Sequence, residues 1–219
     1  MSEKKTVSGS DRELSDITKK LAEEGIQVFA EQIAENISED VELVVYTEAV
    51  TKDSEGWSEL QEAKKLGIQT VNYFEALGSA MNPYYLIAVA GTHGKTTTSA
   101  MLTEVFEVAE KDPTAIIGSL RSKTKSNYRA GKSKYAIAEA CEYKRDFLHL
   151  KPDVLVITNI EHEHVDYYET LEDVQKAFRE LAEQVDEKGV IITDTKSPTI
   201  APILHDLEVE VIDYNDQLD

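Results

Sequence analysis

The sequence predicts an α/β protein in which helices alternate with the strands of a mostly parallel sheet. Two observations support this prediction. Short apolar runs typical of buried strands alternate along the chain with longer segments whose apolar residues recur at helical spacing. In addition, the apolar run at residues 86–90 leads into two glycines, a lysine and a row of threonines, which is the order of a strand, a tight turn and a helix.

The first part of the chain is expected to alternate helices and strands. Ser10 followed by Glu13 has the pattern of a helix-capping box, and apolar residues then recur at helical spacing from Leu14 to Leu21. The same reasoning predicts strands at residues 27–29, 41–47 and 69–71, and helices at residues 57–66 and 73–81.

Pro83 marks an expected boundary, so we expect the chain to divide into residues 1–82 and 83–219. A second α/β series follows the boundary. Strands are expected at residues 86–90, 114–118, 135–139, 154–158, 190–193 and 209–214, and helices at residues 96–109, 171–185 and 199–207. No internal repeat interrupts this series.

Residues 121–134 form the one basic, hydroxyl-rich segment of an acidic chain. Two interpretations carry equal weight. The segment is either a solvated loop or a loop that attracts an anionic substrate, because a local basic island steers phosphate ligands.

Composition excludes several classes of protein. The 219 residues carry 42 acidic and 23 basic side chains, and the formal net charge of −19 argues against sequence-independent binding to nucleic acid or to an anionic membrane surface. The chain has neither the apolar core of a signal peptide nor an apolar run of the ~20 residues that span a bilayer. Cys141, the single cysteine, rules out an internal disulfide and is expected to be a small buried residue. We therefore expect a cytoplasmic protein.

The segment GTHGKTTT at residues 91–98 is interpreted as a triphosphate-binding loop. Gly91 and Gly94 let the backbone approach phosphate oxygens, and the helix that follows presents free N–H groups to an anion. Lys95 is expected to be exposed and to reach the β- and γ-phosphates, while Thr96 would bind Mg²⁺. The position five residues before Gly94 is valine, so the loop departs from the usual GxxxxGK[ST] pattern. His93 either donates to phosphate or caps the turn.

Carboxylates and imidazoles follow two later strands, where parallel sheets place their chemistry. Glu139 and Glu142 end the first of these strands, and the run EHEHVD at residues 161–166 follows the second. Such groups near a triphosphate suit Mg²⁺, although a surface loop or a zinc site is also compatible. His162 and His164 would diverge on a helix, which argues against a zinc helix of the HExxH type. We expect His162 to face solvent and His164 to be the ligand.

Three motifs together resemble the Mur ligases of peptidoglycan synthesis. They are AGTHGKTTT at residues 90–98, EACEY at residues 139–143, and TNIE at residues 158–161 followed by His164 and Asp166. The stretches at residues 7–11, 44–50 and 147–150 extend the resemblance. It implies a partial Rossmann-like domain that binds a nucleotide sugar over residues 1–82, followed by an incomplete ATP-binding domain with a phosphate loop over residues 83–219.

The resemblance implies an ATP-dependent carbon–nitrogen ligase of cell-wall synthesis, of the type that joins L-alanine to UDP-N-acetylmuramate through an acyl phosphate. Lys95 would bind ATP phosphate and Thr96 would bind one Mg²⁺, while Glu139, with His164 as its partner ligand, would hold a second Mg²⁺. Glu142 would be a supporting polar group. The residues implied to contact the nucleotide are Gly91, Thr92, His93, Gly94, Lys95, Thr96, Thr97 and Asn159.

The chain also departs from the family. Cys141 and Tyr143 stand where aspartate and serine are common, and only about six residues precede the first matching stretch, where a strand, loop and helix need roughly thirty. We expect a fragment or a shortened relative with incomplete activity. A non-catalytic nucleotide- or partner-binding module is one alternative, and the ligase that re-attaches recovered murein peptides is another. Exposed sheet edges predict self-association or a complementing chain.

Overall fold

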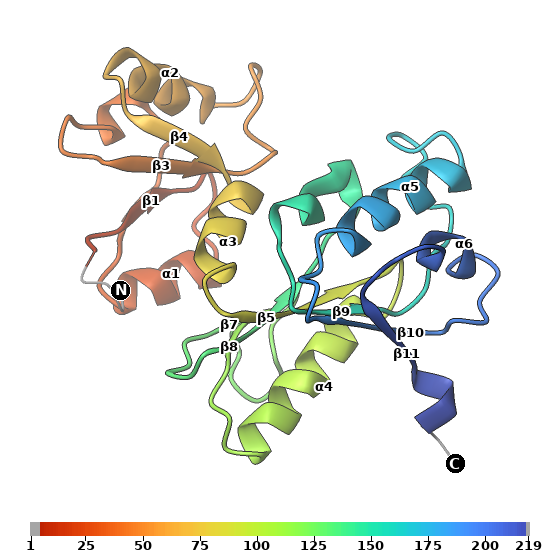
Figure 1. Ribbon diagram of the computed structural model, residues 1–219. Helices are drawn as coiled ribbons and strands as arrows, with labels where there is room; N and C mark the ends of the chain where they lie inside the picture. The colour runs from red at the N-terminus through yellow and green to blue at the C-terminus, as the bar shows by residue number, and fades with distance from the viewer. Residues whose placement is uncertain (1–4, 218–219) are drawn as a thin grey trace. The chain divides into compact units, whose positions relative to one another are not determined.

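The computed structural model describes residues 5–217, which form two compact units that divide between Ala76 and Leu77 (Figure 1). The division lies inside helix α3 (Tyr73–Met81), slightly before the domain boundary expected at residue 82. Both units alternate strands and helices, which confirms the predicted fold class. Within the described residues no helix is long and apolar enough to cross a membrane.

The first unit contains two pairs of parallel strands, each joined by a helix. The strands are β1 (Ser8–Ser10), β2 (Gln27–Phe29), β3 (Leu43–Tyr46) and β4 (Gln69–Asn72), with β1 beside β2 and β3 beside β4. The helices are α1 (Asp16–Glu23), the 3₁₀ turn η1 (Ala34–Asn36) and α2 (Trp57–Lys65). Leu60 and Ala63 of α2 are buried and contribute to the core of this unit.

The predicted capping box at Ser10 and Glu13 is wrong. Ser10 lies in β1, where it pairs with Phe29, and its hydroxyl donates to Glu59 at 2.7 Å. The residue that caps α1 is Ser15, whose hydroxyl oxygen accepts from the backbone N–H of Thr18 at 3.3 Å. The hydroxyl of Ser10 is bound to Glu59 and caps no helix N–H, and the first helix begins at Asp16, later than the sequence pattern indicated.

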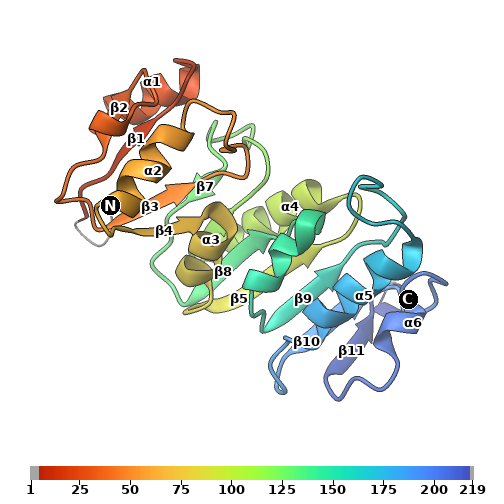
Figure 2. The same ribbon diagram turned by 90° about the horizontal axis from the view of Figure 1, so that it is seen from above.

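The second unit is built on a seven-stranded sheet with the order β11-β10-β9-β5-β8-β6-β7 (Figure 2). Its strands are β5 (Tyr85–Ala90), β6 (Thr114–Ile116), β7 (Tyr128–Arg129), β8 (Tyr135–Glu139), β9 (Val154–Ile157), β10 (Val190–Thr193) and β11 (Glu210–Asp213). All neighbouring pairs are parallel except β6 and the short edge strand β7, which the sequence did not predict. The other predicted strands of this unit are confirmed, with small changes of length.

Helices cover both faces of this sheet (Figure 1). They are α4 (Lys95–Val108), the 3₁₀ segment η2 (Tyr143–His149), α5 (Leu171–Ala182), α6 (Ala201–Leu204) and the 3₁₀ turn η3 (Tyr214–Gln217). α4 lies on one face, and η2 and α5 lie on the other. Between η2 and α5, the buried rings of Phe147 and Phe178 meet edge to face at 5.2 Å.

The central position of β5 explains its uninterrupted apolar sequence. β5 lies between β8 and β9, and its residues from Leu86 to Ala90 are buried. A parallel strand that is covered on both faces reads as a continuous apolar run. Because β9, β5 and β8 are neighbours and parallel, the loops that follow their carboxyl ends meet at one edge of the sheet.

The basic segment at residues 121–134 is ion-paired with α4 and the turn after it. Arg121 is only 6% exposed and donates to the carboxylates of Glu104 and Glu107. Arg129 pairs with Glu107 at 2.5 Å and with Asp112 at 2.7 Å. The hydrogen bonds from Arg121 lower the pKa of Glu107. Carboxylates of α4 and of the turn after it thus neutralise much of the positive charge of this segment, which in one of the two interpretations attracts an anionic ligand.

Replacing Arg121 with alanine is expected to lower the free energy of unfolding by about 2–3 kcal/mol, because two partly buried carboxylates would lose the buried cation that they share. Lys123→Ala is the matched control. Its side chain is 68% exposed and pairs with the same two carboxylates, and its loss should cost at most about 0.5 kcal/mol. Chemical denaturation followed by circular dichroism measures both effects. If both variants lost the same free energy of unfolding, burial of the Arg121 side chain would not explain its contribution.

Candidate functional site

The loop between β5 and α4 depends on two glycines with positive φ. Gly91 has φ 140°, and a Cβ there would lie 2.0 Å from the Thr158 hydroxyl oxygen. Gly94 has φ 82° and precedes the first turn of α4. A side chain at Gly91 would collide with the end of β9, so this glycine permits a close approach of the two loops.

The segment after β9 holds the backbone of this loop in place. Asn159 accepts from the backbone N–H of His93 at 2.9 Å and donates to the carbonyl of the same residue at 3.0 Å. The Thr158 hydroxyl also donates to the His93 carbonyl, at 2.6 Å, and the Thr92 hydroxyl oxygen accepts from the backbone N–H of Glu161 at 2.8 Å. The motifs at residues 90–98 and 158–161, which are far apart in sequence, therefore form one rigid unit.

The N-terminus of α4 is well suited to bind an anion. No side chain caps it, and its first turn contains no acidic residue. The first N–H groups of a helix have no partner within the helix, and the helix dipole places partial positive charge there. A hollow of about 270 Å³ opens at this point. It is lined by Thr92, His93, Gly94, Lys95, Thr96, Thr97 and Glu139.

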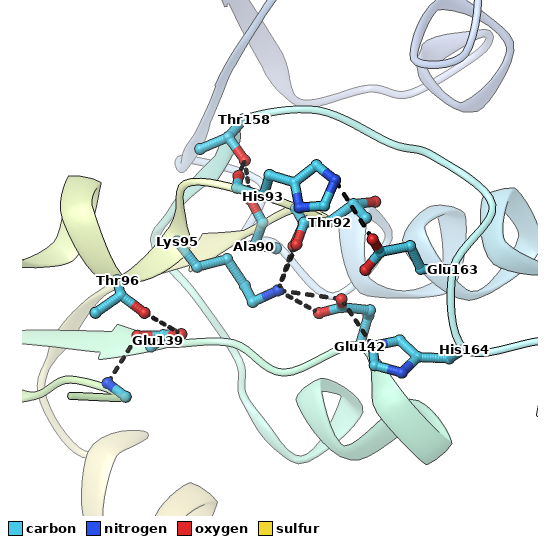
Figure 3. A network of polar contacts seen from close by, with 12 residues as sticks. Ala90, Thr92, His93, Lys95, Thr96, Glu139, Glu142, Thr158, Glu163 and His164 are labelled. Atoms are coloured by element: carbon cyan, nitrogen blue, oxygen red, sulfur yellow. Dashed lines mark hydrogen bonds and ion pairs between the residues drawn. The ribbon is translucent and has the colours of Figure 1, made fainter.

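The prediction that Lys95 is exposed is wrong. Its side chain folds back onto the loop and is only 14% exposed (Figure 3). Its ammonium group donates to the carbonyls of Gly91 at 2.6 Å and Thr92 at 3.1 Å, and it lies 2.9–3.0 Å from both carboxylate oxygens of Glu142. The physical reason is that Glu142 is itself buried, at 2% exposed, and a buried carboxylate needs a cation beside it.

The residues predicted to bind metal fall into two groups (Figure 3). In the first, the carboxylate of Glu139 accepts from the Thr96 hydroxyl at 2.9 Å and from the backbone N–H of Gly118 at 2.7 Å. In the second, the Nε2 atom of His164 lies 3.3 Å from Glu142. The structure therefore brings Thr96 to Glu139, whereas the neighbour of His164 is Glu142 and not Glu139, its expected partner.

The chemistry of these donors fits Mg²⁺ bound together with a triphosphate. Within residues 5–217 no three His, Cys, Asp or Glu side chains are arranged to hold a metal by themselves. Mg²⁺ typically takes one or two protein ligands, keeps several waters and shares phosphate oxygens. The hydroxyl of Thr96 and the carboxylate of Glu139, at the edge of the hollow, provide such a partial set.

Three further residues singled out in the sequence, His93, His162 and Cys141, make separate contacts. His93 points its Nε2 atom at Glu163, 3.4 Å away, rather than into its own turn, so a capping role for its side chain is not seen. His162 is exposed, as predicted, and contacts the carbonyl of Tyr168 at 3.0 Å. Cys141 is only partly buried, and burial raises the pKa of its thiol.

Known protein families match both parts of the chain. Residues 2–85 match the model of the Mur ligase family, catalytic domain, and residues 89–217 match the Mur ligase middle domain. The chain belongs to the Mur ligase family. The phosphate loop, the carboxylates after β8 and the histidine after β9 all lie in the middle domain.

Two curated relatives are UDP-N-acetylmuramate–L-alanine ligases. The protein from Agathobacter rectalis is 41% identical over 210 residues, and the protein from Acetivibrio thermocellus is 40% identical over 210 residues. In both cases the match covers 95% of this chain but only 44–45% of the relative. The chain thus spans about half the length of the curated relatives it matches.

Solved structures of similar ligases also resemble this chain. A UDP-N-acetylmuramate-alanine ligase from Thermotoga maritima has a TM-score of 0.77 and 28% identity, over 90% of this chain and 45% of that one. A UDP-N-acetylmuramate:L-alanyl-gamma-D-glutamyl-meso-diaminopimelate ligase from Neisseria meningitides has a TM-score of 0.82 and 25% identity, over 94% of this chain and 69% of that one.

Gly91→Ala is expected to destabilise the second unit by about 3 kcal/mol or more, because the new Cβ would meet the Thr158 hydroxyl in a backbone conformation that only glycine adopts readily. Gly94→Ala is the control, since a Cβ there meets nothing closer than 4.0 Å and carries only the cost of positive φ, about 1–2 kcal/mol. Thermal and chemical unfolding compare the two variants. If Gly91→Ala lost less stability than Gly94→Ala, the loop and the end of β9 would not be packed as closely as described.

Proposed function

We propose that this chain works as part of an ATP-dependent ligase that joins L-alanine to UDP-N-acetylmuramate. Identity of 37–41% to relatives that carry this activity in their names, over 95% of the chain, supports the proposal. The single structural observation that carries it is Lys95 beside the uncapped N-terminus of α4, which provides a cation and free N–H groups for a triphosphate. Such an enzyme would act in the cytoplasm, where ATP is available.

The proposed ligase reaction has two steps, formation of an acyl phosphate and formation of the amide. A carboxylate oxygen of UDP-N-acetylmuramate attacks the γ-phosphorus of ATP, and ADP leaves with the electron pair of the broken P–O bond. The amine of L-alanine then attacks the carbon of the acyl phosphate, loses a proton and expels inorganic phosphate. Phosphoryl transfer depends on positioning and on charge neutralisation rather than on a covalent side chain. The N–H groups of α4 and the ammonium of Lys95 would supply both.

Binding of the nucleotide requires Lys95 to change partners. In the structure its ammonium is satisfied by two loop carbonyls and by Glu142. Phosphate oxygens would replace these contacts, and the carboxylate of Glu142 would then retain His164 as its neighbour. Lys95 thus neutralises Glu142 before the nucleotide arrives and neutralises phosphate afterwards.

We assign Thr96, Glu139 and His164 to Mg²⁺, with Glu142 and Asn159 as supporting residues. When bound, Mg²⁺ would reduce the repulsion between the substrate carboxylate and the phosphates. Gly118 supports Glu139, because its backbone N–H donates to the carboxylate and a Cβ at this position would lie within 2.7–2.8 Å of it.

A second candidate activity is the ligase that re-attaches murein peptides. Its supporting observation is the TM-score of 0.82 to the tripeptide ligase, at 25% identity. The two activities share UDP-N-acetylmuramate and differ in the component that provides the amine. A nucleotide- or partner-binding module without catalysis is the third possibility.

Calorimetric titration with a non-hydrolysable ATP analogue and Mg²⁺, followed by UDP-N-acetylmuramate, tests the proposal. Binding of the analogue supports a working phosphate site, and its failure to bind would overturn this assignment. ADP release with L-alanine, compared with release with the tripeptide L-alanyl-γ-D-glutamyl-meso-diaminopimelate, then separates the two ligase activities. Nucleotide binding without ADP release in either case would favour the binding module.

Lys95→Ala should weaken binding of the ATP analogue by about 10- to 100-fold, because a charge-assisted hydrogen bond of about 1.5–3 kcal/mol to phosphate is lost. Lys176→Ala, which removes a 70% exposed lysine from α5, should leave the affinity unchanged. Calorimetry measures both, and circular dichroism checks that the variants fold. If the two variants bound the analogue with equal affinity, Lys95 would not contact the phosphates.

His164→Ala should raise the Mg²⁺ concentration needed for half-maximal binding of the ATP analogue by about ten-fold, because one metal-facing group is lost. His162→Ala is the matched control, since this exposed histidine lies two residues earlier in the same turn. A Mg²⁺ titration at constant analogue concentration distinguishes them. If both variants behave like the parent chain, His164 does not face the metal.

A further inference from the structure

Tyr143 packs against the imidazole of His164, and a chain of ring contacts continues from Tyr143 to two further tyrosines in the turn after β9. The ring of Tyr143 lies 4.9 Å from the imidazole, centroid to centroid, and 6.1 Å from the ring of Tyr167. Tyr167 in turn meets Tyr168 edge to face at 4.9 Å. We refer to Tyr143, Tyr167 and Tyr168 as the tyrosine cluster. Its centre is the ring of Tyr143, which contacts both His164 and Tyr167.

Two hydroxyl groups of the tyrosine cluster cross between the turns in opposite directions. Tyr143, from the turn after β8, donates to the carboxylate of Asp166 at 2.7 Å. Tyr168, from the turn after β9, donates to the backbone carbonyl of Glu142 at 2.6 Å. Each turn therefore anchors the other, and we call these two hydrogen bonds the frame. Glu142 from one turn and His164 from the other face each other between them.

The backbone on both sides of the frame is strained. Lys144, Arg145 and His164 have φ values of 52°, 67° and 54°, a region that costs non-glycine residues about 1–2 kcal/mol each. Such conformations persist only where surrounding contacts impose them. The left-handed backbone of His164 sets the direction of its side chain, so the contacts that hold this turn also aim the imidazole.

We propose that Tyr143 is a positioning residue that holds the imidazole of His164 towards Glu142. Its ring packs against one side of the imidazole, and its hydroxyl fixes the turn that carries the imidazole through Asp166. The inference rests on the proposed function, because orientation of His164 matters for the Mg²⁺–triphosphate complex.

The test separates the ring of Tyr143 from its hydroxyl. Tyr143→Phe keeps the ring and removes the bond to Asp166, Asp166→Asn keeps the ring and weakens the same bond, and Tyr143→Leu removes both. Tyr214→Leu, in η3, is the control for loss of a tyrosine elsewhere in the second unit. The conservative variants are expected to fold even if Tyr143→Leu does not.

The first measurement needs neither metal nor nucleotide. NMR records the carbon-bound protons of the His164 imidazole in the full chain, assigned among the five histidines by comparison with His164→Gln. We expect the ring-current shift of these protons to vanish in Tyr143→Leu and to persist in Tyr143→Phe. Unchanged shifts in Tyr143→Leu would overturn the inference. If that variant does not fold, the absence of nuclear Overhauser contacts between the ring protons of Tyr143 and the imidazole protons of His164 in the parent chain would overturn it.

The second measurement is the Mg²⁺ titration of ATP-analogue binding. Loss of a group that orients a ligand should weaken the apparent affinity for Mg²⁺ by about ten-fold in Tyr143→Leu and by less in Tyr143→Phe, with no change in Tyr214→Leu. Parent-like affinity in Tyr143→Leu would overturn the positioning role. If the parent chain itself binds no analogue, the proposed function fails, whereas the NMR comparison still decides whether Tyr143 orients His164.

Discussion

The buried ion pair between Lys95 and Glu142 is the interaction on which the rest of the site depends. It joins the phosphate loop after β5 to the turn after β8, and through Glu142 it reaches His164 in the turn after β9. A carboxylate that is 2% exposed is tolerated only with a partner of opposite charge. The lysine that would serve the nucleotide is therefore also required by the protein in the absence of a nucleotide, and in the proposed function nucleotide binding would exchange one anion for another around this cation.

Around this pair, the site combines a rigid frame with an open anion-binding end. Thr158 and Asn159 fix the carbonyl and N–H of His93, and the tyrosine cluster fixes the two turns that carry Glu142 and His164. The first turn of α4, in contrast, has no side-chain cap. Preorganised donors around a free helix terminus are what a phosphoryl-transfer site needs, since little reorganisation is then required when charge develops.

Particular elements show where reasoning from the sequence succeeds and fails. β5 was predictable because a strand buried on both faces is apolar throughout, and the turn from β5 into α4 was predictable because its glycines are close together in the chain. The cap at Ser10 was predicted wrongly because the pairing of Ser10 with Phe29 depends on a distant segment. The basic segment was ambiguous for the same reason, since the carboxylates that pair with Arg121 and Arg129 lie on α4 and in the turn after it.

The sequence by itself determined the α/β class, the succession of strands and helices, the glycine-rich loop at residues 91–98 and the family to which the chain belongs, because each can be read from short motifs whose residues are neighbours along the chain. Only the tertiary structure decided that Lys95 folds back, that His164 faces Glu142 rather than Glu139, and that Tyr143 packs against His164. These three contacts join residues from different loops. Which side chains meet at the carboxyl edge of a parallel sheet is set by strand order and backbone direction, and neither is written in the spacing of the motifs.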